Sequence, residues 1–437
     1  MKIPIHIPIV KLIHKLFNRN VVIIRLICRV CRILHMNNNI REFNNLTKVL
    51  IEITQYVGVF WYNRNDGSIK LFYFKAVISV LKSTFLEAIF LNCLDKFNGE
   101  RSIFAIYHLL KGKKSSQTIQ DAHLFGLRKL FAAYSAIGRD YLDHCVTAFL
   151  RKGWVLPLGR DHHYRLTGKG KAALDAYLKN QPIPSSLDSW NFNNLDSAFW
   201  GRLSLLVQSL SHMIHERYHF YPIQRDEGIQ NWVKGFFKEY PGSRGAIGRS
   251  LFEELSTLLE QKSDIERYIF VMRLTGVHRI GSTFGQISES IRSDEVYVRF
   301  VFWGTLHFIL KEIRNKQENF PILFSIIKEY PPSADKPLTE SARLTMKMLK
   351  EGKEPKQIAV MRGLKANTIE DHIVEIALAM PSFSIGPFVS GEVADKIHET
   401  VRRAKTKQLK IIKNEISDPQ VSFFQIRLVL TRAGDMS

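Results

Sequence analysis

The residues with the clearest chemical signature form the pattern HExxH: His215, Glu216 and His219. On a helix, this spacing places two imidazoles one turn apart, where they can bind zinc while the glutamate acts as a general base. The neighbouring residues disfavour such a site, because Arg217 would lie beside a dication and Pro222 stands where the longer HExxHxxGxxH form has glycine. A zinc metallohydrolase is therefore a remote alternative. We expect these histidines to form hydrogen bonds at the end of a helix that packs into the core.

Other motifs that carry catalysis are absent from the sequence. Residues 168–171 (GKGK) lack the spacing of a GxxxxGK[ST] phosphate loop and the hydroxyl that coordinates magnesium, and neither GxSxG nor GxGxxG occurs. Cys28 and Cys31 form a CxxC pair, but no second pair of ligands follows at the spacing of a zinc site. We therefore predict a protein that is not an enzyme and that holds no metal and no cofactor.

The net positive charge of the chain indicates which class of partner it binds. The 437 residues include 62 Lys and Arg against 41 Asp and Glu, a net charge of +21. Such an excess favours a polyanion, either nucleic acid or an anionic membrane surface, although an ordinary basic protein with no such partner stays an alternative. The four cysteines are too few for a disulfide-stapled scaffold and fit a reducing compartment, which predicts a cytoplasmic protein.

The N-terminal segment carries part of this charge. Residues 1–35 hold seven basic side chains and no acid, and these interrupt the apolar residues too often for a membrane span or a cleaved signal. We expect no integral membrane association. A start-site extension or loosely attached arm is the preferred interpretation, and a helix on the membrane surface is the alternative.

Two linkers divide the chain, which is long enough for about three domains. Residues 180–194 are rich in Pro, Ser and Asn, and residues 331–337 contain three prolines. Helical periodicity dominates the segments between them, so we predict a mainly α, multi-domain fold. Its parts are a poorly defined basic, apolar extension (1–80), a winged-helix domain (81–180), a helical middle domain (195–330) and a helix-turn-helix domain (338–434).

The winged-helix prediction rests on the order of the elements. Apolar residues recur at helical spacing in residues 103–110, 119–131 and 141–150, and residues 154–167 have the pattern of a β-hairpin. Three helices followed by a hairpin is the order of a winged helix. Basic side chains gather on the third helix and the hairpin, where we expect them to bind DNA phosphates: Arg151, Lys152, Arg160, Arg165, Lys169 and Lys171. A solvated face that binds nothing is the alternative.

This segment resembles the winged-helix domain that follows the motor of RecQ helicases. The resemblance is carried by LLKGKKSSQ (109–117), IGRD (137–140), LRKGW (150–154) and YRLT (164–167). In that family the third helix and the wing contact duplex DNA, and the hairpin can separate the strands. The resemblance places the strand-separating tip at residues 160–163, which include two histidines and no aromatic residue of the Phe, Tyr or Trp type.

The C-terminal segment has the spacing of a helix-turn-helix. That motif needs a small residue where its helices cross, a glycine in the turn four residues on, and a β-branched core residue six beyond, and these are Ala359, Gly363 and Ile369. A helical hairpin of coincidental spacing is the alternative. Because acids occupy the rest of the third helix, we expect only its start to contact DNA, through Lys365, Asn367 and Thr368. A helix predicted over residues 401–413 adds a non-specific electrostatic grip through Arg402, Arg403, Lys405, Lys407, Lys410 and Lys413.

Residues 338–429 resemble the helicase-associated helix-turn-helix domain, through SARLT (341–345), QIA (357–359), TIEDH (368–372) and VSFFQIRLV (421–429). That domain occurs at the C-terminus of some RecQ helicases and in the YpbB-like proteins, whose genes lie beside a RecQ-type helicase gene. The resemblance to the YpbB-like group extends over about residues 85–431, and the chain is identified as a member. It implies a DNA-binding accessory protein of a separate RecQ-type helicase in DNA repair or recombination. A helix-turn-helix transcription regulator is the alternative.

The middle segment says less about function. Residues 281–288 echo the start of a second helix-turn-helix, with Ser288 in place of the usual alanine and Arg292 in place of the usual glycine. We expect the aromatic residues of its helices to form core rather than a stacking surface: Trp200, Trp232, Phe236, Phe237, Trp303 and Phe308.

Overall fold

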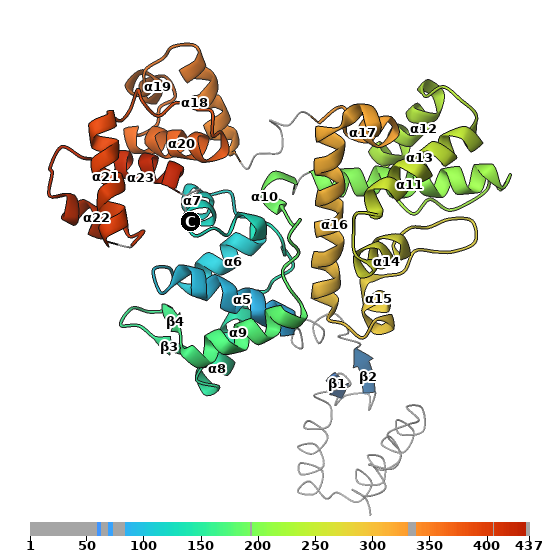
Figure 1. Ribbon diagram of the computed structural model, residues 1–437, viewed down its shortest axis with the longest axis horizontal. Helices are drawn as coiled ribbons and strands as arrows, with labels where there is room; N and C mark the ends of the chain where they lie inside the picture. The colour runs from blue at the N-terminus through green and yellow to red at the C-terminus, as the bar shows by residue number, and fades with distance from the viewer. Residues whose placement is uncertain are drawn as a thin grey trace, which may run out of the picture. The chain divides into compact units, whose positions relative to one another are not determined.

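The computed structural model describes residues 59–62, 69–72, 84–192, 195–330, 338–404 and 406–433 (Figure 1). The chain divides into two compact units, Met1–Val80 and Leu81–Ser437. In the first unit, strand β1 (Val59–Tyr62) pairs antiparallel with β2 (Ile69–Phe72). The remainder of the predicted extension, including Cys28 and Cys31, lies outside the described residues. The second unit is mainly helical, as predicted.

The segment after residue 83 has the predicted order of three helices and a hairpin, preceded by one further helix. Its elements are α5 (Thr84–Phe97), α6 (Ile103–Lys111), α7 (Ser116–Leu124), η1 (Arg128–Leu130), α8 (Arg139–Arg151), β3 (Val155–Pro157), β4 (Tyr164–Leu166) and α9 (Gly168–Asn180). The single helix predicted over residues 119–131 is wrong. Helix α7 ends at Leu124 because Gly126 adopts a left-handed φ of 65°, and a short 3-10 turn follows.

The middle segment is helical and has a large aromatic core. Its elements are α10 (Ser189–Phe192), α11 (Leu195–Ile214), α12 (Glu227–Glu239), α13 (Arg244–Leu259), α14 (Asp264–Met272), α15 (Phe284–Ser290), α16 (Glu295–Asn315), η2 (Gln317–Asn319) and α17 (Pro321–Ile327). Trp200 of α11 and Phe302 of α16 meet edge to face at the centre, with ring centroids 4.8 Å apart. The six aromatic residues predicted as core are buried or packed against it, so that prediction is confirmed.

The described residues of the C-terminal segment, 338–404 and 406–433, form six helices. They are α18 (Glu340–Lys350), α19 (Pro355–Met361), α20 (Ala366–Ala379), α21 (Gly391–Ala404), α22 (Leu409–Ile416) and α23 (Phe423–Ala433). The single helix predicted over residues 401–413 is wrong, because the chain leaves helical geometry between α21 and α22. Here the backbone N–H of Lys407 donates to the Glu100 carboxylate instead of to a carbonyl one turn earlier.

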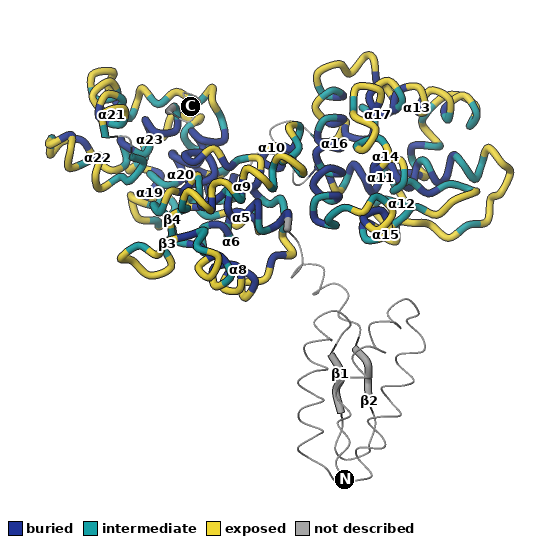
Figure 2. Tube along the Cα trace, turned by 60° about the horizontal axis from the view of Figure 1, so that its bottom comes forward, coloured by how far each residue is buried: buried dark blue, intermediate teal, exposed yellow. Residues whose placement is uncertain are grey.

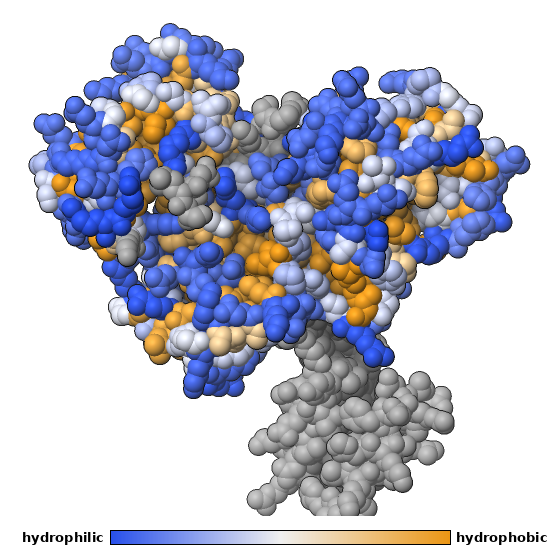
Figure 3. Space-filling view, in the orientation of Figure 1, coloured by the Kyte–Doolittle hydropathy of each residue, from blue (hydrophilic) through white to orange (hydrophobic). Residues whose placement is uncertain are grey.

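Helix α20 lies at the centre of the C-terminal segment. It contacts α18, α19 and α23, and it also contacts α7 from the earlier segment. Figure 2 shows α20 as largely buried, whereas long stretches of α21 and α22 are exposed. Hydrophilic residues cover most of the described surface visible in Figure 3. Among the described residues, no helix is both long and apolar enough to cross a membrane.

Candidate nucleic-acid interface

Four cations lie exposed around the end of α8 and the hairpin. Arg151 ends α8, Arg160 lies in the tip between the strands, Arg165 lies on β4 opposite Leu156, and Lys169 lies in the first turn of α9. None of the four forms a salt bridge with any residue of the described part of the chain. Their charges are therefore available to an anion, and a phosphate backbone is an anion that can contact several cations at once.

Two other predicted phosphate ligands already have acidic partners. The Lys152 ammonium lies 3.7 Å from the Glu87 carboxylate and 4.1 Å from the Trp154 ring centroid. The Lys171 ammonium donates to Asp95 at 2.8 Å, and this hydrogen bond raises the pKa of Lys171. Both acids belong to α5, a helix to which the sequence analysis assigned no role. A phosphate would have to compete with them, so Lys152 and Lys171 are weaker candidates than the other four.

The hairpin tip is attached to α6. His162 has a left-handed φ of 60°, and its carbonyl accepts a hydrogen bond from the Ile103 N–H at 3.0 Å. Its ring lies against Phe104, with centroids 4.8 Å apart, and the Arg139 guanidinium lies 4.4 Å from that same phenyl ring. The tip is therefore fixed beside the start of α6 in this structure, and its arginine, Arg160, faces solvent.

The predicted helix-turn-helix is present in α19 and α20. Ala359 and Ile369 are buried, and Gly363 adopts a left-handed φ of 60° in the turn, a conformation that favours glycine. The Arg362 guanidinium donates two 2.8 Å hydrogen bonds, to the carbonyl and to the hydroxyl of Ser341. These bonds attach the turn to the preceding helix α18 and fix the direction in which α20 starts.

Only the first turn of α20 is open to a ligand. Lys365 and Asn367 are exposed and Thr368 is half-buried, whereas every residue from His372 to Ala379 is buried. Glu375 is one of the acids expected to repel DNA, but its carboxylate accepts hydrogen bonds from the N–H and hydroxyl of Thr339 at the start of α18. Burial raises the pKa of Glu375. The sequence could have predicted that the second half of α20 is buried. Residues 373–380 (IVEIALAM) are almost all apolar, and a helix that is apolar on all sides is a buried one.

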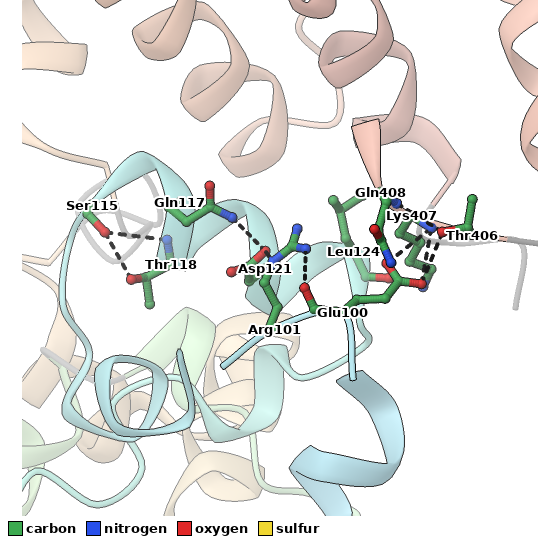
Figure 4. Close-up of polar contacts among 10 residues, drawn as sticks. All are labelled: Glu100, Arg101, Ser115, Gln117, Thr118, Asp121, Leu124, Thr406, Lys407 and Gln408. Atoms are coloured by element: carbon green, nitrogen blue, oxygen red, sulfur yellow. Dashed lines mark hydrogen bonds and ion pairs between the residues drawn. The ribbon is translucent and has the colours of Figure 1, made fainter. Parts of the chain in front are cut away.

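The basic residues near the C-terminus divide into exposed and anchored side chains. Arg402 and Lys410 are exposed, Arg403 lies 3.4 Å from the Glu415 carboxylate, and Lys405 lies outside the described residues. The Lys407 ammonium donates to the Leu124 carbonyl at the end of α7, as Figure 4 shows. Burial lowers the pKa of Lys407. Lys413 donates to carbonyls including that of Asp418. Lys407 and Lys413 are therefore bonded within the fold, and they are weaker candidates for phosphate contact than Arg402 and Lys410.

The HExxH pattern lies outside a helix. Helix α11 ends at Ile214, and Glu216 has a left-handed φ of 56°. The N–H groups of Glu216 and Arg217 donate to the carbonyls of Met213 and His212, which is the hydrogen-bond pattern of a Schellman motif. The His215 ring donates from Nδ1 to the Ser211 carbonyl oxygen, 2.8 Å away, so the expected hydrogen bond at a helix end is confirmed for this histidine. Both histidines of the pattern are exposed, however, and the expectation that they lie on a core-packed helix is wrong.

This geometry predicts that Glu216→Gly stabilises the protein by about 0.5–1 kcal/mol, because glycine adopts a left-handed φ without the strain of a side chain. Glu216→Ala keeps the strain and should leave the free energy of unfolding nearly unchanged. Urea unfolding of the two variants measures both values. Destabilisation by Glu216→Gly would show that the Glu216 side chain has a role that the Schellman motif does not explain.

Comparison with known proteins identifies the chain's relatives. A family model described as a helix-turn-helix domain matches residues 341–430, from α18 to α23. Protein YpbB of Bacillus subtilis (strain 168) is 35% identical over 348 residues, which cover 80% of this chain and 97% of that protein. The chain belongs to the YpbB family. No solved structure matches it.

Membership of the YpbB family places the helix-turn-helix domain in context. The matched residues include α21 to α23 as well as α18 to α20. The last three helices therefore belong to the domain that the family model describes, and α23 packs directly against α20. In this YpbB-family chain the helix-turn-helix is thus built into a larger unit that leaves only the start of α20 exposed.

Proposed function

We propose that the protein is a non-enzymatic accessory protein that binds duplex DNA through its phosphates. The group of exposed cations Arg151, Arg160, Arg165 and Lys169, on α8, the hairpin and α9, carries this proposal. In a winged helix, the end of the third helix and the hairpin lie together on one side, which matches the order α8, β3 and β4. We assign this segment to the winged-helix type found after the motor of RecQ helicases, and we place its action in the cytoplasm.

The distribution of charge supports the location. Residues 81–180 carry sixteen Lys and Arg against eight Asp and Glu, whereas residues 195–330 carry seventeen against sixteen. A positive field of this kind attracts DNA of any sequence. The C-terminal domain adds Arg402 and Lys410, together with Lys365 and Asn367 at the exposed start of α20. Phosphate contact without insertion of a helix into a groove gives affinity with little sequence preference.

This mode of binding predicts a steep dependence on salt and a weak dependence on sequence. The logarithm of the binding constant should fall linearly with the logarithm of the salt concentration, by about 0.9 for each phosphate contacted on duplex DNA. Fluorescence anisotropy with several unrelated duplexes over a range of salt concentrations measures this slope. The alternative, a transcription regulator, would bind a preferred site about 10³-fold or more tightly than random DNA. A sharp consensus from a binding-site selection experiment would therefore contradict our proposal.

We further propose that the protein works with a separate RecQ-type helicase in DNA repair or recombination. Two segments that resemble helicase-associated domains occur here in a chain that has no motor motif in its sequence. Affinity purification of the protein from its source cell, with nuclease added to remove bridging DNA, should recover that helicase. Recovery of RNA polymerase in its place would favour the regulator.

A further inference from the structure

The loop between α11 and α12 exposes two tyrosine rings. Tyr218 is 67% exposed and Tyr221 is 97% exposed, whereas most large aromatic side chains of the middle segment are buried or half-buried. Exposed aromatic rings three positions apart on one loop lose the hydrophobic stabilisation that burial gives, and patches of this kind mark binding surfaces. The sequence interpretation assigned this region to the core because of its apolar neighbours, and the structure corrects that.

Side-chain hydrogen bonds fix the path of this loop. The Gln208 side chain of α11 donates to the Tyr221 carbonyl at 3.0 Å and accepts from the Ile223 N–H at 2.8 Å. The rings of His212 and Phe220 stack with centroids 4.4 Å apart, and the Schellman motif at Glu216 fixes the start of the loop. The backbone that carries the tyrosines is therefore ordered in the free protein. A ligand that stacks on the rings would not have to order the loop first.

Two further segments meet the loop at the end of α11. The Ser211 hydroxyl accepts from the Val277 N–H at 3.0 Å, and the rings of His215 and His278 lie 4.9 Å apart. On α13, a Cβ added to Gly248 would lie 2.6 Å from the Ile214 side chain, so α13 passes close to the start of the loop at that point. The next residue along α13, Arg249, is exposed. Hydrophobic and hydrophilic residues alternate over this end of the middle segment, on the right of Figure 3.

Cations flank the two rings. Arg217 precedes Tyr218 directly, Arg225 follows Tyr221 by four residues, and both are exposed. The acids of the loop and its end are Glu216, Asp226 and Glu227, and the Asp226 carboxylate is occupied as the N-cap of α12, where it accepts from the Ile229 N–H at 2.9 Å. Two exposed rings between two guanidinium groups offer both features that a single strand needs, a face on which bases stack and cations for its phosphates.

We infer that the surface of this loop, formed by Arg217, Tyr218, Tyr221 and Arg225, binds single-stranded nucleic acid. Bases of an unpaired strand stack on the tyrosine rings, and its phosphates face the arginines. Duplex DNA is a poor ligand for the same surface, because its bases are already stacked on one another. The site lies on the middle segment and is separate from the proposed duplex-binding cations, so the two can succeed or fail independently.

The test compares the affinities of fluorescent dT and rU oligonucleotides of about 20 nucleotides, long enough to cover one site, and of a random duplex. The variant carries Tyr218→Ala and Tyr221→Ala. We expect it to lose single-strand affinity by about 5- to 150-fold for each ring that stacks, with duplex affinity unchanged. Because both rings are exposed, the variant should fold normally. The two oligonucleotides show whether the strand is DNA, RNA or either.

Two controls separate stacking from other causes. The pair Tyr218→Phe and Tyr221→Phe keeps the rings and should bind single strands like the unmodified protein, and Phe423→Ala removes a half-exposed ring elsewhere and should have no effect. Alanine at Arg151, Arg160, Arg165 and Lys169 should greatly weaken duplex binding and leave most of the dT affinity. The inference is overturned if the tyrosine-to-alanine variant binds both oligonucleotides as well as the unmodified protein does, or if it loses duplex and single-strand affinity equally.

Discussion

Replacement of Arg151, Arg160, Arg165 and Lys169 together by alanine should lower the affinity for random duplex DNA by about a thousandfold at 0.1 M salt. Each phosphate contact contributes about 0.9 to the slope of the salt dependence, so the loss of four contacts should reduce that slope by about 3 to 4. These four side chains are exposed and lie outside every salt bridge of the described residues, so their loss should leave the fold intact. Fluorescence anisotropy over a salt series measures both quantities.

A matched control removes the same charge from another part of the chain. Lys234, Lys238, Lys311 and Lys328 are exposed lysines of the middle segment. Their joint replacement by alanine lowers the net charge equally but should change the salt slope little, because the lysines lie outside the proposed DNA-contacting group. An equal loss of affinity in the control would mean that overall charge, and not the surface formed by α8, the hairpin and α9, determines binding.

Ile373→Ala should destabilise the C-terminal domain by about 2–5 kcal/mol, the usual cost of a large cavity in a core. Ile373 is 0% exposed in α20, the helix that contacts α7, α18, α19 and α23. The matched control is Val360→Ala in α19, where the side chain is 83% exposed and its loss should change stability by less than about 0.5 kcal/mol. Urea unfolding, followed by hydrogen exchange of the amides in α18 to α23, measures the difference.

The same pair of variants tests whether α20 acts as a DNA-recognition helix or as a core helix of the domain. A recognition helix presents its exposed face to a groove, so a substitution there alters DNA binding and leaves stability almost unchanged. Because α20 is enclosed from His372 onward, Ile373→Ala should have the opposite effect, with stability lost first. A variant that kept its stability but lost a preferred DNA site would contradict the enclosed position of α20 and favour the regulator.

Much of the local structure could be predicted from the sequence, because short-range physics fixes it. The spacing of Ala359, Gly363 and Ile369 predicted the helix-turn-helix, since only small, flexible and β-branched residues satisfy those positions. Helical periodicity followed by alternation predicted the order of α6, α7, α8 and the hairpin. The positions of Arg160 and Arg165 on an exposed hairpin also followed from the sequence, because charged side chains at a tight turn remain in water.

Only the tertiary structure decided which charges remain available. Lys407 and Arg402 are close in the sequence, but Lys407 is bonded to Leu124 and Glu100, about 280 to 310 positions away, whereas Arg402 faces solvent. Lys171 forms a hydrogen-bonded ion pair with Asp95 of α5, which precedes it by 76 residues. No local pattern encodes such pairs, because the acids and carbonyls that bind a lysine come from whichever segment the fold brings beside it.

The same reason explains the correction at the end of α11. We expected the histidines of HExxH to lie on a helix that packs into the core, but α11 ends at Ile214, one residue before the pattern. Tyr218 and Tyr221 in the loop that follows are exposed, and the Gln208 side chain of α11 is hydrogen-bonded to the backbone of that loop at Tyr221 and Ile223. Residue type therefore determined what chemistry the chain could perform, whereas long-range packing decided which side chains were left free to perform it.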